Sequence, residues 1–188
     1  MYPSTLSKPV IAAVNGAVAG IGLAFALWCD LRFSSKSAKF VTAFSKRGLV
    51  AEWGISWTLP RLVGHGNAMM LLLSSEVILG EEAYRLGIVQ RVVDHDVLAH
   101  AVAFAKGLAA SVSPVSMAVM KQQLWRGHAE AEEDMRRSVH LMALSLTKEN
   151  PDFAEGVASF VEKRSPNFKP ISQANPVINA VRVLCAKL

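Results

Sequence analysis

The amino-acid sequence predicts an α/β domain whose C-terminal half is helical. Short apolar runs broken by glycine turns fill the first part of the chain, and apolar residues recur at helical spacing after residue 96. The 188 residues, 52% hydrophobic and 19% charged, suit one domain with a substantial core. The sequence has no internal repeat, low-complexity segment or convincing linker. We therefore expect one structural unit, with an α/β core in residues 1–110 and a helical C-terminal region in residues 111–188.

The first element must be distinguished from a membrane span. Residues 10–29 form a run of twenty residues without a charge, which is long enough to cross a bilayer and contains a GxxxG spacing. The same run has features of a secretory signal. However, Asn15-Gly16 is a strong turn dipeptide, and further glycines follow it. We favour a buried strand over Val10–Val14, a glycine turn and a helix over Gly22–Trp28, and we expect no membrane partner.

The next elements follow from apolar content, β-branching and turn residues. Three further segments are predicted strands: Leu31–Phe33, Lys39–Thr42 and Ile88–Val93. Ser34–Ala38 is polar and typical of a turn, and Gly48–Gly54 is typical of a loop. Leu59–Ser75 predicts one buried helix that opens with Pro60. Gly80–Ala83, with acids in its first turn, predicts a helix start.

Helical patterns dominate the second half of the chain. Asp96–Ala110 and Val115–Trp125 are predicted helices. Intervals of four, three and four residues place four apolar side chains on one face of another helix: Met135, Val139, Met142 and Leu146. Asn150-Pro151-Asp152 combines a cap, a first-position proline and an acid, which together start a helix. Its apolar face would comprise Phe153, Val157, Phe160 and Val161.

Composition excludes several function classes. Cys29 and Cys185 are too few for a disulfide framework or a four-cysteine zinc site, so a reduced, cytoplasmic compartment is expected. The five histidines have no metal-ligand spacing with cysteine, and no metal is expected. No G-x-S-x-G nucleophile motif is present, although the sequence leaves a Ser-His-Asp arrangement open as an alternative.

The net charge of +5 is concentrated at the C-terminal end. No acidic residue follows Glu162, while five cations do: Lys163, Arg164, Lys169, Arg182 and Lys187. Such a segment suits phosphate, nucleic acid or an anionic surface, or it is simply a solvated end. Because aromatic and basic residues do not interleave, we expect no nucleic-acid partner.

The glycine turn is the first candidate site. Gly20 and Gly22 allow a ligand to approach the backbone closely, and the following helix points free N–H groups and a positive dipole toward it. This geometry suits a phosphate or an oxyanion. It is not a dinucleotide fingerprint, because Phe25 occupies the third glycine position. The alternative is a tight strand-to-helix turn without a ligand.

Glu52 is the second candidate. It lies in the loop Gly48–Gly54 between apolar neighbours. Burial disfavours a charged carboxylate and makes it a better base. Alternatively, Glu52 pairs with Arg47, Arg61 or solvent.

Several motifs together resemble the enoyl-CoA hydratase/isomerase (crotonase) family. The resemblance covers residues 8–170 and rests on motifs in family order: Lys8–Gly16, Gly20-x-Gly22, Cys29-Asp30, Leu59–Gly64, Ala83–Val89 and Phe160–Phe168. It implies a spiral of ββα units and a C-terminal helical region that trimerises, with trimers that often pair. It also implies an acyl-CoA thioester as substrate and no cofactor beyond the coenzyme A of that thioester.

The resemblance also assigns residues. Two backbone N–H groups of the family hold the thioester oxygen while an enolate forms, and one of them falls at Ile21. Lys163 matches a position that reaches a CoA phosphate on a neighbouring subunit, which suits a homotrimer or a dimer of trimers. Family hydratases use two glutamates to activate water, and the matching positions here are Ala24 and Phe44. Neither side chain transfers protons.

Glu52 matches the position where some family isomerases carry their base. The resemblance therefore favours a double-bond shift in an enoyl-CoA by a single carboxylate. Family members usually have a further N-terminal segment, with much of the CoA site and the second N–H donor, which precedes the match to Lys8. Residues 1–110 would thus form a partial spiral core. The alternatives are an enoyl-CoA hydratase, or a truncated, inactive member that acts only in assembly.

Overall fold

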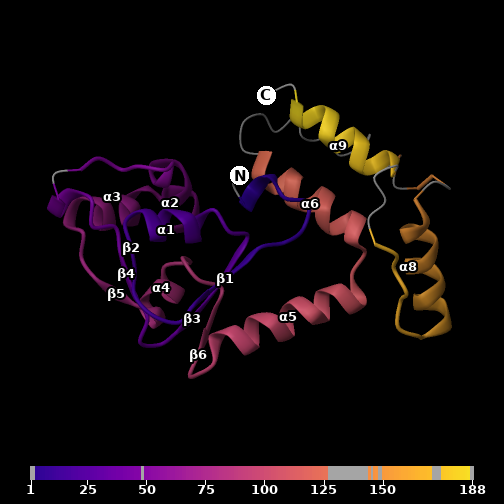
Figure 1. Cartoon of the computed structure of the whole chain (residues 1–188), viewed down its shortest axis with the longest axis horizontal. Coiled ribbons are helices and arrows are strands. Elements are labelled where there is room, and N and C mark those ends of the chain that lie inside the picture. The colour runs from indigo at the N-terminus through magenta and orange to yellow at the C-terminus, as the bar shows by residue number, and fades with distance from the viewer. Residues whose placement is uncertain are drawn as a thin grey trace. The chain divides into compact units, whose positions relative to one another are not determined.

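The computed structural model describes residues 3–47, 49–126, 144, 146, 147, 150–170 and 175–186 (Figure 1). The chain forms two compact units. The first comprises Val10–Phe104 with the first three residues, and the second comprises Ala105–Leu188 with Ser4–Pro9. Each unit is described here by itself. The grouping of residues 1–110 and 111–188 into one structural unit stays a prediction.

Two small sheets form the framework of the first unit (Figure 1). In one sheet, β1 (Ile11–Val14), β3 (Leu31–Ser35) and β6 (Arg91–Val93) run parallel, with β3 in the centre. In the other, β2 (Val18–Ala19) runs parallel to β4 (Lys39–Val41), and β5 (Ile78–Leu79) runs antiparallel to β4. Strands β1 and β2 are apolar throughout, while the central strand β3 also carries Arg32, Ser34 and Ser35 at buried positions.

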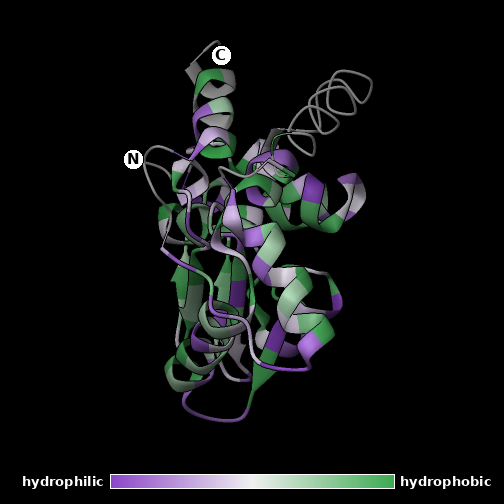
Figure 2. Cartoon of the chain, turned by 90° about the vertical axis from the view of Figure 1, so that its right-hand side faces the viewer, coloured by the Kyte–Doolittle hydropathy of each residue, from purple (hydrophilic) through white to green (hydrophobic). Residues whose placement is uncertain are grey.

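Four helices and part of a fifth pack around these sheets. They are α1 (Ile21–Leu27), α2 (Ile55–Val63), α3 (His65–Ser74), α4 (Gly80–Arg85) and α5 (Val97–Ser111). Short 3₁₀ turns occur at Pro3–Thr5 and Ser45–Arg47. Phe40, Ile55 and Leu59 are at most 1% exposed in the largest core cluster, which joins strands to α1, α2 and α3. Figure 2 shows hydrophobic and hydrophilic residues side by side on the helices, as amphipathic packing requires.

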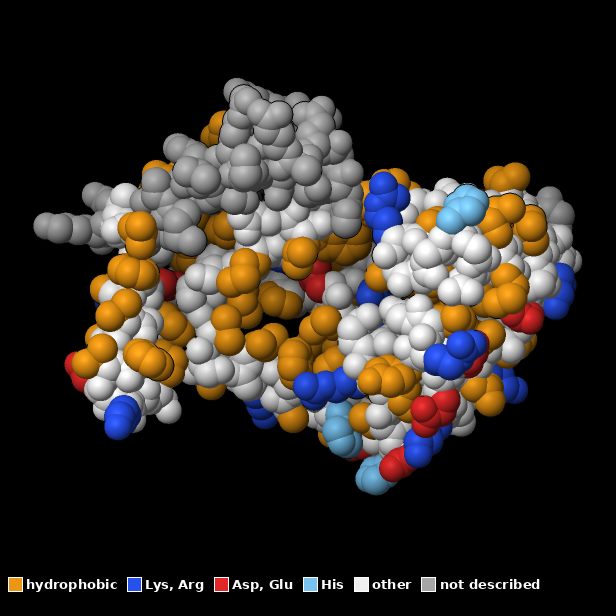
Figure 3. All heavy atoms as spheres, turned by 180° about the vertical axis from the view of Figure 1, so that it is seen from behind, with side chains coloured by type: hydrophobic (Ala, Val, Ile, Leu, Met, Phe, Trp, Pro, Cys, Tyr) orange, Lys and Arg blue, Asp and Glu red, His pale blue; other side chains and the backbone are white. Residues whose placement is uncertain are grey.

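The second unit contains α6 (Pro114–Arg126), α8 (Pro151–Glu162) and α9 (Pro176–Ala186). Val177 and Ile178 of α9 are buried against an apolar patch of α6. The buried Asp152 carboxylate accepts a hydrogen bond of 2.5 Å from the Ser113 hydroxyl, which ties the start of α8 to the start of α6. The apolar face predicted for α8 is exposed in the single chain (Figure 3).

Most predicted elements are confirmed within one to three residues, and local signals explain why. The exceptions are informative. The single helix over Leu59–Ser75 is wrong: α2 and α3 are separate helices divided at Gly64, whose φ of 78° breaks a right-handed helix. The prediction that this segment is buried is also wrong in part, since Leu73 is 68% exposed.

Strand boundaries account for the other corrections. Ser34 and Ser35 extend β3 instead of forming a turn, because they pair with Val92 and Val93 of β6. Ile88 and Val89 are buried but lie outside β6. The strands β2 and β5 and the helix α9 were not predicted. The predicted helix over Met135–Leu146 lies largely outside the described residues.

No single helix among the described residues is long and apolar enough to cross a bilayer. Helices α5 and α6 reach that length and composition only when they are taken together across the break between Ser111 and Pro114.

Candidate functional site

The glycine turn before α1 is built as a strand-to-helix connection. Gly20 has a φ of 52° and its N–H donates to the Val41 carbonyl at 3.1 Å, so the turn is fixed to β4. The first helical hydrogen bond runs from the Ala24 N–H to the Gly20 carbonyl at 3.0 Å. The N–H groups of Ile21 and Gly22 precede that bond, as in the first turn of any α-helix. The turn therefore leaves these two amides outside the helical hydrogen-bond ladder.

The two glycines have different roles in this turn. Gly20 supplies a backbone conformation that side chains rarely adopt. At Gly22, a Cβ would lie 3.6 Å from the Val18 side chain, which is ordinary contact, so a small side chain would also fit against β2 there. The Ile21 side chain is 46% exposed. The N-terminus of α1 is therefore reachable from the surface of the first unit.

The two positions that match the hydratase glutamates lie in the core. Ala24 is fully buried and Phe44 is 4% exposed, and both belong to the largest apolar cluster. An apolar core position offers no group to hold or ionise water. The structure thus places packing side chains where the resemblance expects acids.

Glu52 lies in the loop between Phe44 and α2, and its side chain is half-buried. Its carbonyl accepts the Ile55 N–H at 3.1 Å, which leads the chain into α2. Within the described residues its carboxylate forms neither a hydrogen bond nor an ion pair. Arg61 instead donates to the Trp57 carbonyl at 2.8 Å and lies 3.8 Å from the centroid of the Trp57 ring. The alternative of a pairing with Arg61 or Arg47 is therefore not seen.

Aromatic contacts bring the Glu52 loop and α1 together. The Trp28 indole N–H, just after α1, donates to the Trp53 carbonyl at 2.8 Å. The Phe25 ring, on α1, lies 5.8 Å from the Trp53 ring between centroids. Glu52 is next to Trp53, so its loop packs against the C-terminal part of α1, the helix that begins at Ile21.

The aromatic residues of this region were not predicted from the sequence as part of a site. Three of the four tryptophans, Trp28, Trp53 and Trp57, meet here, and the rings of Trp28 and Trp57 stack at 5.7 Å. Trp53 and Trp57 are four residues apart and lie on either side of the start of α2. This spacing was a signal in the sequence that the two rings could lie in one region. Phe25 and Trp53 are each close to half exposed, which gives the region an open apolar surface beside Glu52.

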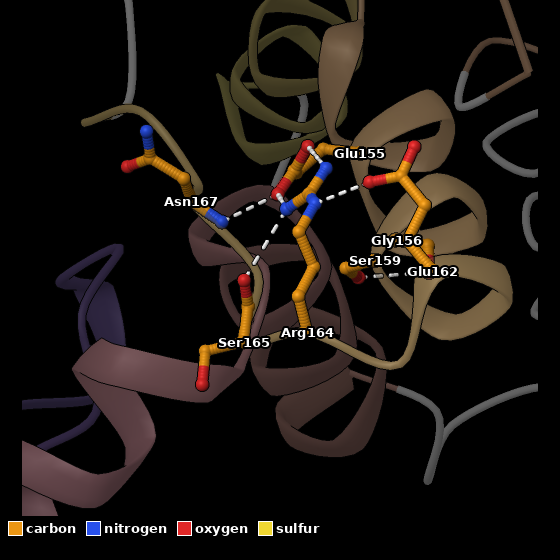
Figure 4. Close-up of polar contacts among 7 residues, drawn as sticks. All are labelled: Glu155, Gly156, Ser159, Glu162, Arg164, Ser165 and Asn167. Atoms are coloured by element: carbon orange, nitrogen blue, oxygen red, sulfur yellow. Dashed lines mark hydrogen bonds and ion pairs between the residues drawn. The ribbon is translucent and has the colours of Figure 1, made fainter.

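Lys163 lies in the second unit. It ends α8 in a left-handed conformation with a φ of 54°, and its side chain is exposed. The next residue, Arg164, is held by two acids: its guanidinium donates to Glu155 at 2.6 and 2.9 Å and to Glu162 at 2.5 Å (Figure 4). Unlike Arg164, Lys163 forms no ion pair with an acid in the described part of the chain.

The pKa values of this cluster follow its hydrogen bonds. The Arg164 guanidinium, together with the Asn167 N–H, lowers the pKa of the Glu155 carboxyl to about 2. The same bond with Glu155, and a second one with Glu162, raises the pKa of Arg164. Figure 4 shows the Glu155 carboxylate between the guanidinium and the backbone of Asn167. The turn after α8 therefore carries a network of ion pairs, formed by Arg164 with Glu155 and Glu162, next to Lys163.

No three histidine, cysteine, aspartate or glutamate side chains in the described parts of the chain gather in a way that would hold a metal ion.

The sequence is similar to those of known acyl-CoA enzymes. The sequence profile of the family described as "Enoyl-CoA hydratase/isomerase" matches residues 3–171. The 1,2-epoxyphenylacetyl-CoA isomerase of Escherichia coli is 36% identical over 166 residues, which are 87% of this chain and 62% of that protein. The crotonyl-CoA hydratase of Syntrophomonas wolfei is also 36% identical, over 163 residues, with 87% and 62% covered. The chain thus spans less than two thirds of the length of these relatives.

Solved structures show the same fold. The enoyl-CoA hydratase from Bacillus anthracis superposes with a TM-score of 0.82 at 29% identity, over 89% of this chain and 64% of that one. A protein of Streptomyces coelicolor, described as a putative enoyl-CoA hydratase, gives 0.83 at 30% identity, over 89% and 61%. The predicted fold class, a crotonase-like α/β arrangement, is confirmed by these superpositions.

Proposed function

The chain belongs to the enoyl-CoA hydratase/isomerase family, and we propose that it shifts a double bond in an enoyl-CoA, with Glu52 as its single carboxylate base. Relatives of equal identity are named as an isomerase and as a hydratase, so kinship alone does not choose the reaction. The residues favour the isomerase. Ala24 and Phe44 are buried and apolar where the resemblance expects the water-activating glutamates.

The proposed mechanism needs one base and one stabilised oxygen. The Glu52 carboxylate removes a proton from C2 of a 3-enoyl-CoA, and the electron pair moves onto the thioester oxygen to give a dienolate. The N–H of Ile21 donates to that oxygen, and a preorganised donor of this kind is worth about 3 kcal/mol. Glu52 then returns the same proton to C4, and the double bond lies between C2 and C3. Atoms and electrons balance without water or a redox partner.

One observation carries the proposal. The Glu52 carboxylate is half-buried and has no hydrogen-bond or ion-pair partner within the described residues, while aromatic contacts fix its loop to α1. A carboxylate held in this way is available for a substrate proton. A carboxylate engaged by Arg47 or Arg61 would be neutralised and turned away.

The remaining parts of the proposal rest on the resemblance. Lys163, whose exposed side chain is not tied to an acid in the described structure, would bind a CoA phosphate. The assembly would be a homotrimer or a dimer of trimers, which suits the exposed apolar face of α8. Coenzyme A enters as part of the substrate, no separate cofactor is required, and the cytoplasm is the proposed compartment.

The test is to supply the full chain with a 3-enoyl-CoA and, separately, with a 2-enoyl-CoA, and to follow the products by mass and ultraviolet absorption. We expect a shifted double bond without hydration, and loss of turnover in Glu52→Gln. Glu76→Gln, at an exposed position, is the matched control and should turn over like the parent chain. A hydrated product would assign a hydratase. A folded chain that is silent on both substrates would assign an inactive member that acts in assembly.

A further inference from the structure

The loop that carries Glu52 has an unusual backbone. Trp53 and Gly54, the two residues after Glu52, have φ values of 52° and 69°, so both lie in the left-handed region. Glycine adopts this region freely, but a tryptophan does so only at a cost. Such strain persists where the surroundings over-determine it, and it clusters at functional sites. Something outside the loop must therefore hold the Trp53 conformation.

Trp28 contacts both of these residues. Its indole N–H donates to the Trp53 carbonyl at 2.8 Å. Its ring also lies against Gly54, where a Cβ would be 2.9 Å from the Trp28 Cζ2 atom. One side chain therefore binds the carbonyl of the first left-handed residue and occupies the side-chain space of the second.

Trp28 is itself held in place. Its ring stacks on Trp57 of α2 with an interplanar angle of 6°. It directly follows α1, whose Phe25 contacts the Trp53 ring. The indole is thus anchored on the two helices that border the Glu52 loop.

We propose that Trp28 is a positioning residue, whose indole holds the left-handed Trp53–Gly54 pair and so fixes the direction of the Glu52 carboxylate. The inference rests on the proposed function, since it names a residue that acts through Glu52. Trp28 does not touch the substrate in this scheme. Its contribution is to keep the base aligned with the proton at C2, and a misalignment of about 1 Å costs on the order of 100-fold in rate.

The kinetic test is a double-mutant cycle in the full chain. Trp28→Phe removes the N–H donor and keeps an aromatic ring. With a 3-enoyl-CoA we expect kcat to fall about 10- to 100-fold with little change in KM. The same substitution in a Glu52→Asp background, which keeps a carboxylate and a measurable rate, should cost clearly less than in the parent chain, because the shortened base is already out of position. Equal losses in both backgrounds would overturn the proposal. Trp125→Phe, the same chemical change on α6, is the matched control and should leave kcat unchanged.

The second test does not depend on turnover. Hydrogen exchange read by mass spectrometry should show the amides of Ile55, Trp57 and Thr58, which donate to the Glu52 and Gly54 carbonyls, exchanging about tenfold faster in Trp28→Phe, with α5 unaltered. Gly54→Ala changes the loop and keeps Trp28: the added Cβ would lie 2.9 Å from the indole and force the loop away from it, so this variant should show the same faster exchange. Unaltered exchange in both variants would overturn the proposal whatever the activity.

The two proposals fail in different ways. Full turnover by Glu52→Gln would remove the proposed base. Loss of turnover in Glu52→Gln, with normal kcat and normal exchange in Trp28→Phe, would remove only the positioning role of Trp28.

Discussion

Replacement of Arg32 by methionine should destabilise the first unit by about 3 kcal/mol. Arg32 is 2% exposed, and its guanidinium donates to the carbonyls of Ala26 and Leu27 at the end of α1, at 3.3 and 3.4 Å. It donates to the carbonyls of Ile88 at 2.5 Å and Cys29 at 2.6 Å, and to the Gln90 side chain at 3.3 Å. Hydrogen bonds to a charged group contribute about 1.5–3 kcal/mol each, so the two short bonds, with smaller contributions from the longer ones, supply about 6 kcal/mol.

Burial of the guanidinium opposes this gain. Desolvation lowers the pKa of Arg32 to about 10 against the raising effects of Cys29 and Asp30, which corresponds to a cost of roughly 3 kcal/mol at about 1.4 kcal/mol per pKa unit. The difference between the two contributions is the expected loss of about 3 kcal/mol. In Arg32→Met the desolvation cost disappears, but the buried carbonyls lose their donors. The stability of Arg32→Lys should lie between those of the parent chain and Arg32→Met, because an ammonium group cannot reproduce the forked donors of the guanidinium.

The measurement is urea unfolding of the full chain, followed by far-ultraviolet circular dichroism. A lower midpoint with an unchanged slope would report a loss of stability rather than a change in the unfolded chain. Arg85→Met is the matched control, because Arg85 is exposed and pairs only with Glu82 in the described structure. It should leave the midpoint nearly unchanged. An Arg32→Met chain as stable as its parent would show that burial of the charge costs as much as its hydrogen bonds contribute, and would refute the reasoning.

Two further predictions concern charge and packing. The pKa of Glu155 is lowered to about 2 in the folded chain by Arg164 and the Asn167 N–H, so its contribution to stability is complete above its ordinary pKa of about 4.5 and disappears as the pH falls toward 2. Carbon-13 NMR of labelled glutamate should show Glu155 titrating at this low pH, and Arg164→Ala should raise its pKa toward the ordinary value. A Glu155 carboxyl that titrates near its ordinary pKa in the parent chain would contradict the ion pair. In Gly80→Ala the new Cβ would lie 2.1 Å from the Ser35 carbonyl oxygen, which should lower the Tm sharply, by a loss of about 1–3 kcal/mol or more. Gly107→Ala, in open space within α5, should instead gain about 0.5–1 kcal/mol, and equal thermal shifts for the two variants would count against this packing.

Local signals predicted the elements whose causes are local. Asn150-Pro151 marks the start of α8, and the structure begins that helix at Pro151. The same pair of residue types, Asn175-Pro176, precedes α9, and the Asn175 side chain accepts the N–H groups of Val177 and Ile178 at 3.0 and 3.3 Å. The signal for α9 was therefore present in the sequence, although this segment was interpreted only by its basic charges.

Elements that depend on distant partners could not be predicted in this way. Strand β2 has two residues, and it exists because Val18 and Ala19 pair with Phe40 and Val41 of β4. Helix α2 begins five residues before Pro60, although proline disfavours a helix interior. Its start is decided by the burial of Ile55 and Leu59, both fully buried, in the core that α1 and α3 complete. Tertiary packing overrides the local penalty of the proline.

The candidate site divides along the same line. That a carboxylate occupies the loop at position 52 follows from the sequence, and so does the glycine turn before Ile21. The orientation of that carboxylate does not, because it depends on Trp53 in a conformation that costs a non-glycine residue about 1–2 kcal/mol. The contacts that offset this cost come from Trp28, which lies 25 residues earlier in the chain. Because the identity of a base is local and its direction is tertiary, a residue outside the family motifs contributes to the proposed chemistry through the base that it positions.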